Sequence, residues 1–315
     1  MVEQSRVTPD LPDSEIKAAF GPSLEFSRAL GPLTSFGTGG PARYFLPVRS
    51  IDDLSRAVAT ARQLSLPVFI LGGGSNLLVS DEGYNGLVVR LEITGLRLVE
   101  PMIIEAGGGE ELAALVDFAS EQSLTGLEFA TGIWGTVGGA VYGNAGAFGS
   151  DIGQVLTEVG LVDPAGRTRT VSADYLAFEY RCSKLKTSGE ILVTARFSLL
   201  KGKRSEIKAR VQDILKQRAD QHPLDRTAGC FFKNVPDPAE PHGKMPAGRL
   251  LEEAGAGSLS VGGARVYEKH ANIIVTDKRA TSKDIRLLAD MMKKKVNDRF
   301  GIELQEEIQQ LGSFH

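Results

Sequence analysis

The chain contains few of the residues that mark metal sites, secreted proteins and membrane spans. It has two cysteines, Cys182 and Cys230, and four histidines, and neither set shows the spacing of metal ligands. So few cysteines fit a reducing compartment. No apolar run approaches the roughly 20 residues that cross a bilayer, and the N-terminal residues lack the apolar core of a signal peptide. We therefore expect no metal site, no membrane association and a cytoplasmic location.

Neither sign of charge predominates, and the chain has no low-complexity tract or internal repeat. Its 36 lysines and arginines and 39 aspartates and glutamates give a formal net charge of −3. Because nucleic-acid-binding domains carry a basic surface, we expect no nucleic-acid partner. The hydrophobic fraction of 42% is ordinary for a globular protein, and 315 residues allow two or three domains. The oligomeric state stays open, with a monomer slightly favoured.

Two glycine-rich apolar stretches organise the chain, which has 36 glycines in all. In residues 131–149, seven of the nineteen residues are glycine and none is charged. Glycine allows the backbone to adopt positive φ or to lie close against another group. This stretch is too apolar for a surface linker and too glycine-rich for a packed helix. We expect a buried backbone surface that lies against a large, flat group.

The second stretch, residues 66–79, runs from a short apolar strand into Gly72, Gly73 and Gly74. Three successive glycines let bare N–H groups converge on an anion such as a diphosphate. No Gly-Lys-Ser/Thr follows either stretch, and neither reads Gly-x-Gly-x-x-Gly at the start of a helix. A P-loop and a Rossmann site are therefore disfavoured.

Hydrophobic periodicity gives a coarse map of the elements. Strands are expected at the end of 34–48 and at 68–71, 86–91, 103–106, 155–162, 168–171 and 191–199, with a hairpin turn at Asp163–Gly166. Helices are expected at 51–64, 110–120, 201–218, 247–255 and 281–300, and Thr281 and Asp284 resemble a capping box. The map predicts a loose arm or short helix in residues 1–22, a strand-rich block in 23–202 and a separate C-terminal domain in 203–315.

Three polar segments carry candidate chemistry, and each also has an ordinary structural explanation. Arg181 suits an anionic substrate group, because arginine binds carboxylates bidentately and stays protonated, but most such stretches seen alone are surface turns. Cys230 taken alone is best explained as a buried, inert thiol. A thiol is also a plausible proton donor, because a pKa near ~8.5 keeps it protonated at neutral pH. Glu306 and Glu307 taken alone are solvated carboxylates at the end of a strand.

Seven segments in order resemble the UDP-N-acetylenolpyruvoylglucosamine reductase family, the flavoenzymes of peptidoglycan precursor synthesis. They read TSFGTGG at 34–40, LGGGSNLL at 71–78, GIWGTVGGA at 132–140 with NAGAFG at 144–149, YRCS at 180–183, AGCFFKN at 228–234, AGRL at 247–250 with EEA at 252–254, and EKHAN at 268–272. One such motif is weak, whereas seven in order are specific. They span roughly residues 33–275, and the last strand extends the similarity to about residue 312.

The resemblance implies an α+β fold. Residues 23–202 would form an FAD-binding module of the vanillyl-alcohol-oxidase type, with two subdomains that divide near residues 93–100. Residues 203–315 would form a C-terminal α/β substrate-binding domain. The implied cofactors are FAD and NADPH, and the implied partner is a small molecule, the enolpyruvyl ether of a UDP-sugar. The implied activity is the reduction of UDP-N-acetylglucosamine enolpyruvate to UDP-N-acetylmuramate.

The family's motifs also place site residues on this sequence. The implied cofactor-binding residues are Gly72, Gly73, Gly74, Ser75, Asn76, Leu77, Thr131, Gly132, Thr136, Gly138, Gly139, Asn144 and Gly146. The implied substrate-binding residues are Tyr180, Lys233, Asn234, Arg249, His270 and Asn272.

The implied reaction has two halves. NADPH passes hydride to the flavin, and the reduced flavin passes hydride to the enolpyruvyl methylene carbon. Charge then develops on the substrate carboxylate, where Arg181 is the matching cation and Glu307 the assisting acid. Cys230 matches the proton donor to the α-carbon, which is serine in many relatives. A neighbouring cation such as Lys233 would favour the thiolate, which cannot donate a proton.

The sequence departs from the family pattern at several positions. Trp134 stands where proline is usual, and Ile273 replaces an aromatic residue. Glu306 beside Glu307 leaves the assisting acid open by one position. Little sequence separates Tyr180 from Cys230, so the shorter branch of the family, without a tyrosine-bearing insertion, is the better match.

Two other functions stay open. An FAD-dependent sugar or aldonolactone oxidase on the same cofactor fold would consume oxygen with a sugar alcohol, but it leaves the Tyr180–Arg181 and Gly229–Cys230 motifs unexplained. A non-catalytic nucleotide-binding module would tolerate the loss of Arg181, Cys230 and Glu307.

Overall fold

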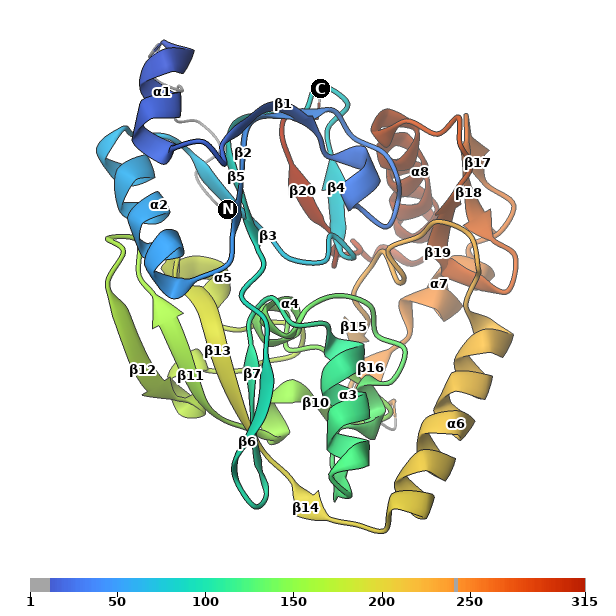
Figure 1. The fold of residues 1–315 in the computed structure, drawn as a ribbon. Coiled ribbons are helices and arrows are strands. Elements are labelled where there is room, and N and C mark those ends of the chain that lie inside the picture. Colours follow the sequence, from blue (N-terminus) through green and yellow to red (C-terminus); the bar gives the residue numbers. More distant parts are fainter. Residues whose placement is uncertain (1–11, 241–242, 315) are drawn as a thin grey trace. The chain divides into compact units, whose positions relative to one another are not determined.

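The computed structural model describes residues 12–240 and 243–314, along which helices and strands are interspersed (Figure 1). The chain divides into two compact units. Unit 1 comprises the described residues of Met1–Ser27, Arg43–Gly73 and Asn85–Arg218, and unit 2 those of Arg28–Ala42, Gly74–Tyr84 and Ala219–His315. Two short N-terminal segments thus belong to the same unit as the C-terminal part of the chain.

This division differs from contiguous domains that meet at residue 203, and the predicted boundaries there and near residues 93–100 stay predictions. Of the predicted N-terminal arm, residues 1–11 lie outside the described residues. Residues 12–22 contain the helix α1 (Asp13–Phe20). Of the two alternatives expected for this region, a loose arm or a short helix, these residues form the short helix.

Most of a four-stranded sheet lies in unit 1, in the order β1 (Glu25–Ala29), β2 (Pro41–Val48), β5 (Tyr84–Leu91) and β3 (Val68–Leu71). β3 and β5 pair in parallel, with Val68 opposite Leu87. Helix α2 (Ile51–Gln63) begins where the sequence predicts, because the Ser50 hydroxyl accepts a hydrogen bond from the Asp53 N–H at 3.1 Å. The apolar face of α2 and the inner face of these strands share one hydrophobic cluster.

A five-stranded sheet in unit 1 has the order β12 (Thr168–Ser172), β11 (Leu156–Val162), β13 (Ile191–Ser198), β7 (Ile103–Gly107) and β6 (Leu96–Glu100). Its strand pairs are antiparallel. The β11–β12 hairpin turns at the predicted place, where Asp163 Oδ1 accepts hydrogen bonds from the N–H groups of Ala165 and Arg167 at 2.8 and 3.0 Å. Helix α3 (Leu112–Glu121) shares a hydrophobic cluster with this sheet.

The glycine-rich stretch contains a helix, so the expectation that residues 131–149 are too glycine-rich for one is wrong. Helix α4 (Val137–Tyr142) is capped by Thr136, whose hydroxyl accepts a hydrogen bond from the Gly139 N–H at 3.3 Å. A Cβ atom at Gly138 would lie 2.7 Å from the Gly108 carbonyl oxygen. Glycine at this position therefore allows the helix to pack directly on another backbone segment.

Unit 2 contains the antiparallel sheet β17 (Ser260–Val261), β18 (Ala264–Tyr267) and β19 (His270–Thr276), and the parallel pair β4 (Leu77–Val79) and β20 (Gln309–Leu311). Helices α7 (Ala247–Glu253) and α8 (Ser282–Phe300) share a hydrophobic cluster with these strands. The predicted capping box of α8 is confirmed: the Asp284 N–H donates to the Thr281 hydroxyl, and the Thr281 N–H donates to the Asp284 carboxylate.

Helix α6 (Arg204–Gln221) lies slightly later than the predicted 201–218. Ile207 and Ile214 are buried as expected, whereas Leu215, which was expected on the same apolar face, is 41% exposed. The short elements are η1 (Gly31–Leu33), β8 (Leu124–Thr125), η2 (Glu128–Ala130), β9 (Gly146–Ala147), β10 (Ser150–Asp151), η3 (Ile152–Gln154), η4 (Ala173–Leu176), α5 (Leu185–Ser188), β14 (Leu200–Lys201), β15 (Val235–Pro236) and β16 (Lys244–Met245).

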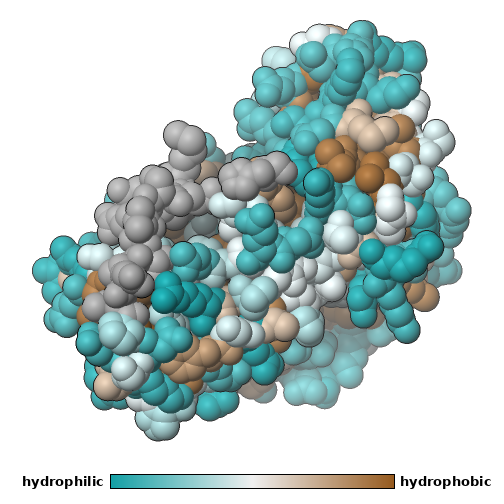
Figure 2. Space-filling view, turned by 90° about the horizontal axis from the view of Figure 1, so that it is seen from above, coloured by the Kyte–Doolittle hydropathy of each residue, from teal (hydrophilic) through white to brown (hydrophobic). Residues whose placement is uncertain are grey.

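On the face of the molecule shown in Figure 2, hydrophilic residues predominate and hydrophobic residues form separate patches. Two large exposed hydrophobic side chains, Trp134 and Phe148, belong to the glycine-rich stretch. In the described part of the chain, no helix combines the length and apolarity that a bilayer span needs. The same residues form no group of three or more His, Cys, Asp and Glu side chains that would hold a metal ion.

Candidate active site

The glycines at 72–74 allow close approaches between backbone segments. A Cβ atom at Gly72 would lie 2.6 Å from Thr136 Oγ1, and one at Gly73 would lie 2.8 Å from Gly135 Cα. Gly74 has a φ of 64°. Gly72 and Gly73 belong to unit 1, and the other predicted cofactor residues of this segment belong to unit 2: Gly74, Ser75, Asn76 and Leu77. The close packing explains why Gly72 and Gly73 carry no side chain, and the predicted binding of a diphosphate by this segment stays a prediction.

Thr131 carries a buried hydroxyl whose Oγ1 has no hydrogen-bond partner among the described residues. The residue is 5% exposed and directly precedes Gly132, whose φ is 72°. An unsatisfied buried hydroxyl costs about 1–3 kcal/mol, so nearly all buried polar groups find a partner. A polar atom of a bound cofactor would be such a partner. Thr131 therefore fits its predicted role in holding FAD.

Two further glycines of the predicted cofactor set differ in their surroundings. A Cβ atom at Gly146 would lie 2.6 Å from the Ser150 carbonyl oxygen, which only glycine avoids. A Cβ atom at Gly139 would lie 3.5 Å from Thr136 Oγ1, which is an ordinary contact. Local packing therefore explains why residue 146 is glycine, whereas at residue 139 it leaves room for a Cβ atom.

Asn144 is buried, and its amide bonds to the backbone at both ends. Its Nδ2 donates to the Glu179 carbonyl oxygen at 3.0 Å, and its Oδ1 accepts from the Gly153 N–H at 3.0 Å. Its backbone is left-handed, with a φ of 44°. Asn144 thus joins the glycine-rich stretch to the segment that carries Tyr180 and Arg181.

Arg181 has a φ of 54°, in the left-handed region that glycine and asparagine favour. Glu179 and Cys182 exchange both backbone hydrogen bonds, each 3.1 Å long, so Tyr180 and Arg181 are the central residues of a tight turn. The guanidinium carbon lies 5.4 Å from the centre of the Tyr180 ring. A bulky residue at the second central position is strained, and such strain clusters at functional sites.

Cys230 lies at the start of an extended segment in unit 2 that is held on both sides by backbone pairing. It pairs with Ile273 of β19. The next two residues, Phe231 and Phe232, are 0% and 1% exposed and anchor the segment in the core. Asn272 bonds to both ends of the Phe232 peptide, since its Oδ1 accepts from the Phe232 N–H at 2.9 Å and its Nδ2 donates to the Phe232 carbonyl at 2.8 Å. The half-buried thiol thus has a fixed backbone.

Glu307 lies beside the Cys230 segment on its other side. The Glu307 N–H donates to the Phe231 carbonyl oxygen at 2.9 Å. The Glu307 carbonyl in turn accepts a hydrogen bond from Asn76 Nδ2 at 3.1 Å. Unit 2 therefore brings together three predicted site residues: Cys230, Glu307 and Asn76.

The neighbouring carboxylate, Glu306, is bound in an ion-pair network. It lies 2.7 Å from Arg286 and 3.5 Å from Lys293, and it accepts a hydrogen bond from Gln310 at 2.6 Å. Both Arg286 and Glu306 have side chains that are 16% exposed. These partners bind both carboxylate oxygens of Glu306, and Glu307 stays the predicted assisting acid.

Lys233, Asn234 and His270 lie in the same unit. The Lys233 N–H donates to the Gln305 carbonyl at 2.8 Å, and Asn234 Oδ1 accepts from the Ala247 N–H at the start of α7 at 3.1 Å. Burial lowers the pKa of His270, which favours the neutral imidazole. The Lys233 backbone and the Asn234 side chain are therefore held by hydrogen bonds, and the substrate roles of all three residues stay predictions.

Arg249 has the least support among the predicted substrate residues. Its guanidinium lies 2.8 Å from Glu240 and 3.1 Å from Glu253, and the side chain is 55% exposed. This arrangement is that of a surface ion-pair network.

The fold and the site place the chain in a class of flavoenzymes. A model described as an FAD binding domain matches residues 41–172. A model described as the C-terminal domain of UDP-N-acetylenolpyruvoylglucosamine reductase matches residues 220–311. The chain is an FAD-dependent oxidoreductase with an α+β cofactor module of the vanillyl-alcohol-oxidase type and a second, C-terminal domain.

Curated relatives then define the family. The chain is 39% identical over 280 residues to a UDP-N-acetylenolpyruvoylglucosamine reductase of Caldanaerobacter subterraneus subsp. tengcongensis, covering 89% of this chain and 90% of the relative. It is 36% identical over 307 residues to that of Syntrophus aciditrophicus, covering 95% of each. The chain belongs to the UDP-N-acetylenolpyruvoylglucosamine reductase family.

Solved structures agree with this assignment. The crystal structure of the reductase from Thermus caldophilus has a TM-score of 0.78 at 32% identity, covering 92% of this chain and 98% of that one. A variant of Phl p 4, a glucose oxidase, has a TM-score of 0.50 at 15% identity, covering 93% of this chain and 60% of that one. The second similarity is one of fold alone.

Proposed function

We propose that the chain catalyses the NADPH-dependent reduction of UDP-N-acetylglucosamine enolpyruvate to UDP-N-acetylmuramate, a step of peptidoglycan precursor synthesis. The observation that carries the proposal is the hydrogen bonding of the unit-2 backbone segments that carry Cys230, Glu307 and Asn76, in a chain that covers about nine-tenths of a reductase with this activity in its name. When bound, FAD supplies the reversible hydride chemistry between NADPH and the substrate.

The residues that would hold FAD are the predicted cofactor-binding set. The main support is the buried Thr131 hydroxyl, which lacks a protein partner among the described residues. Thr136 has a second task as the cap of α4. Asn144 bonds through both ends of its amide to backbone, and its proposed role is to position the cofactor stretch.

Arg181 would bind the substrate carboxylate and stabilise the charge that develops there. Arginine is suited to this task because its charge persists at every physiological pH and its planar fork matches a carboxylate. The tight turn fixes the backbone from which the guanidinium extends. A charge held in advance of the reaction costs no reorganisation when the reaction occurs.

Cys230 would donate the proton that completes the substrate's α-carbon, and Glu307 would assist at the developing charge. Backbone bonds to Asn272 and Glu307 hold the segment between them in place. Because both ends of the Asn272 amide bind Phe232 and the residue is 1% exposed, we assign Asn272 a positioning role in place of the predicted substrate contact. We also propose that the protein works in the cytoplasm and is a monomer. Sedimentation of the purified protein would test the monomeric state.

The test is anaerobic absorption spectroscopy of the purified protein, titrated with NADPH and then given UDP-N-acetylglucosamine enolpyruvate. We expect NADPH to bleach the flavin and the enolpyruvate to restore its colour. Bleaching without recovery would remove the assigned substrate, and oxygen consumption with a sugar alcohol would then support an oxidase. A protein that takes up no FAD would contradict the whole proposal.

The same assay tests the proton donor. Cys230→Ala should slow flavin reoxidation by about 100-fold or more and leave reduction by NADPH intact, because general acid catalysis contributes about 10²–10⁴-fold. Cys230→Ser should retain partial turnover, and Cys182→Ser is the matched control for loss of a half-buried thiol. Normal reoxidation in the alanine variant would defeat the assignment.

A further inference from the structure

The Arg181 turn belongs to a loop that is closed and anchored at several points. The loop is closed by a hydrogen bond of 2.8 Å from the Lys184 N–H to the Leu176 carbonyl. Ser183 Oγ donates to the Tyr142 carbonyl at the end of α4, also at 2.8 Å. With the bond from Asn144 to Glu179, two side-chain hydrogen bonds flank the turn. Neither of them touches Arg181 itself.

Lys186 contacts Arg181 directly. Its ammonium group donates to the Arg181 carbonyl oxygen at 2.8 Å. The same ammonium lies 5.6 Å from the centre of the Tyr142 ring. Lys186 is half-buried on the short helix α5, which follows the turn. The charged Lys186 side chain therefore links helix α5 to the peptide group that follows the strained residue Arg181.

The position of this bond determines what it restrains. The Arg181 carbonyl belongs to the peptide plane that ψ of Arg181 rotates, and φ of the same residue is already strained at 54°. A hydrogen bond to a charged donor is shorter and about twice as strong as a neutral one. Fixing that plane fixes the direction in which the Cα–Cβ bond of Arg181 points.

We propose that Lys186 is a positioning residue for catalysis, which holds the strained Arg181 peptide so that the guanidinium is aimed in advance. This rests on the proposed function, in which Arg181 binds the substrate carboxylate. Loss of Lys186 lets the turn relax and adds conformations in which the arginine is misdirected. The half-reaction that uses Arg181 then slows, while the hydride transfer from NADPH does not.

The experiment compares Lys186→Met with Lys184→Met in the anaerobic half-reactions. Lys184 is the matched control, since its ammonium lies 3.8 Å from the centre of the Tyr175 ring on the same loop. We expect Lys186→Met to slow flavin reoxidation by about 10- to 100-fold, the cost of a misplaced group, with reduction by NADPH within about twofold. Lys186→Arg should restore most of the rate, because it keeps a charged N–H donor. Equal rates in the two methionine variants would overturn the proposal.

A thermal denaturation cycle tests the contact without any substrate. If Lys186 holds the strained Arg181 peptide, Lys186→Met should lower the melting temperature less in the wild-type chain than in an Arg181→Gly chain. In the wild-type chain, release of the strain offsets part of the lost hydrogen bond, whereas glycine has no strain to release. Equal losses in both backgrounds would overturn the positioning role. The two experiments can also disagree. If the enolpyruvate never reoxidises the wild-type flavin but the effect of Lys186→Met on the melting temperature still differs between the two backgrounds, the proposed function is wrong and the contact between Lys186 and Arg181 stands.

Discussion

Among single residues, Arg181 shows most clearly how local strain and function combine. A non-glycine residue in the left-handed region costs about 1–2 kcal/mol, and Arg181 adopts this conformation at a turn where glycine would not be strained. Natural chains keep such costs when a side chain is needed at that point. Stability and activity should therefore respond in opposite directions to a change here.

We predict that Arg181→Gly raises the free energy of unfolding by about 0.5–1 kcal/mol, the strain removed less the added entropy of glycine. Flavin reoxidation by the enolpyruvate should fall by about 100-fold or more, as when an oxyanion-binding donor is removed. Chemical denaturation and the anaerobic half-reactions measure the two effects.

Ala177→Gly is the matched control for this prediction. Ala177 has a φ of 44° at the end of η4 and lies on the same exposed loop. It should gain similar stability and keep normal reoxidation. If Arg181→Gly retained normal reoxidation, the guanidinium would not be the catalytic cation.

At the scale of elements, the sequence predicted those whose signals are local. β3 was predicted at its observed bounds because an apolar run ends at glycine, and α8 because its capping box lies within four residues. Helix α4 was missed because Gly138 packs on Gly108, and that contact is invisible to local composition. The ion pair between Glu306 and Arg286 was likewise invisible, because the sequence alone does not bring these two residues near each other.

The candidate site shows the same limit. Motifs supplied the predicted residues, including Asn272, but they do not reveal the hydrogen bonds between Asn272 and Phe232, because these bonds join distant segments. Lys186 was not singled out from the sequence, since a lysine on a polar loop resembles any solvated charge.

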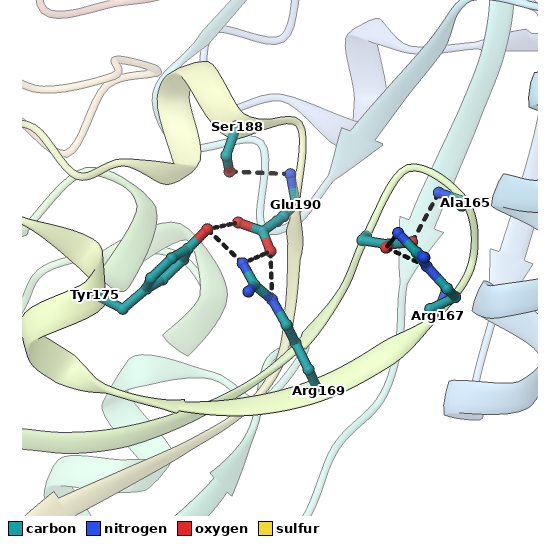
Figure 3. A network of polar contacts seen from close by, with 7 residues as sticks. Ala165, Arg167, Arg169, Tyr175, Ser188 and Glu190 are labelled. Carbon is teal, nitrogen blue, oxygen red and sulfur yellow. Dashed lines mark hydrogen bonds and ion pairs between the residues drawn. The ribbon is translucent and has the colours of Figure 1, made fainter.

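The hairpin β11–β12 carries a polar network that should make stability depend on pH (Figure 3). Glu190 is buried and bonds to Tyr175 at 2.8 Å and to Arg169 Nε at 2.9 Å. Burial alone would raise the pKa of Glu190, but the hydrogen bonds outweigh burial, and the pKa lies below its ordinary value of 4.5. A lowered carboxyl pKa stabilises the fold above the unfolded pKa, and this stability is lost as pH falls through the folded pKa.

We predict that Arg169→Gln lowers the melting temperature by a few degrees at pH 7 and flattens its decline below pH 4.5. The control is Arg167→Gln on the same hairpin, because Arg167 is 81% exposed in its pair with Asp163 and exposed pairs contribute little. Melting curves from pH 7 to pH 3 measure both variants. Parallel curves for the wild type and Arg169→Gln would contradict the network's role.

At the scale of the whole molecule, folding and cofactor binding are linked. A ligand that binds only the folded chain adds RT ln(1 + [L]/Kd) to its stability, about 2.7 kcal/mol at one hundred times Kd. The three hydrophobic clusters fix the scaffold without any ligand. Thr131, in contrast, carries a buried hydroxyl that the described protein atoms leave unsatisfied.

The stabilising effect of removing the Thr131 hydroxyl should therefore disappear when FAD is bound. Thr131→Val keeps the shape of the side chain and removes the hydroxyl, so it should stabilise the FAD-free protein by about 1 kcal/mol, the lower end of the penalty for an unsatisfied buried group. In the holoprotein the same change removes a hydrogen bond to the cofactor, and the stabilisation that saturating FAD adds should shrink by about 1 kcal/mol. Thermal unfolding across a series of FAD concentrations separates the effect on the FAD-free fold from the effect on FAD binding. The matched control is Thr157→Val, because the Thr157 hydroxyl is exposed and donates to the Arg196 carbonyl at 3.1 Å. A loss of stability in the FAD-free Thr131→Val protein would mean that the hydroxyl serves the fold and not the cofactor.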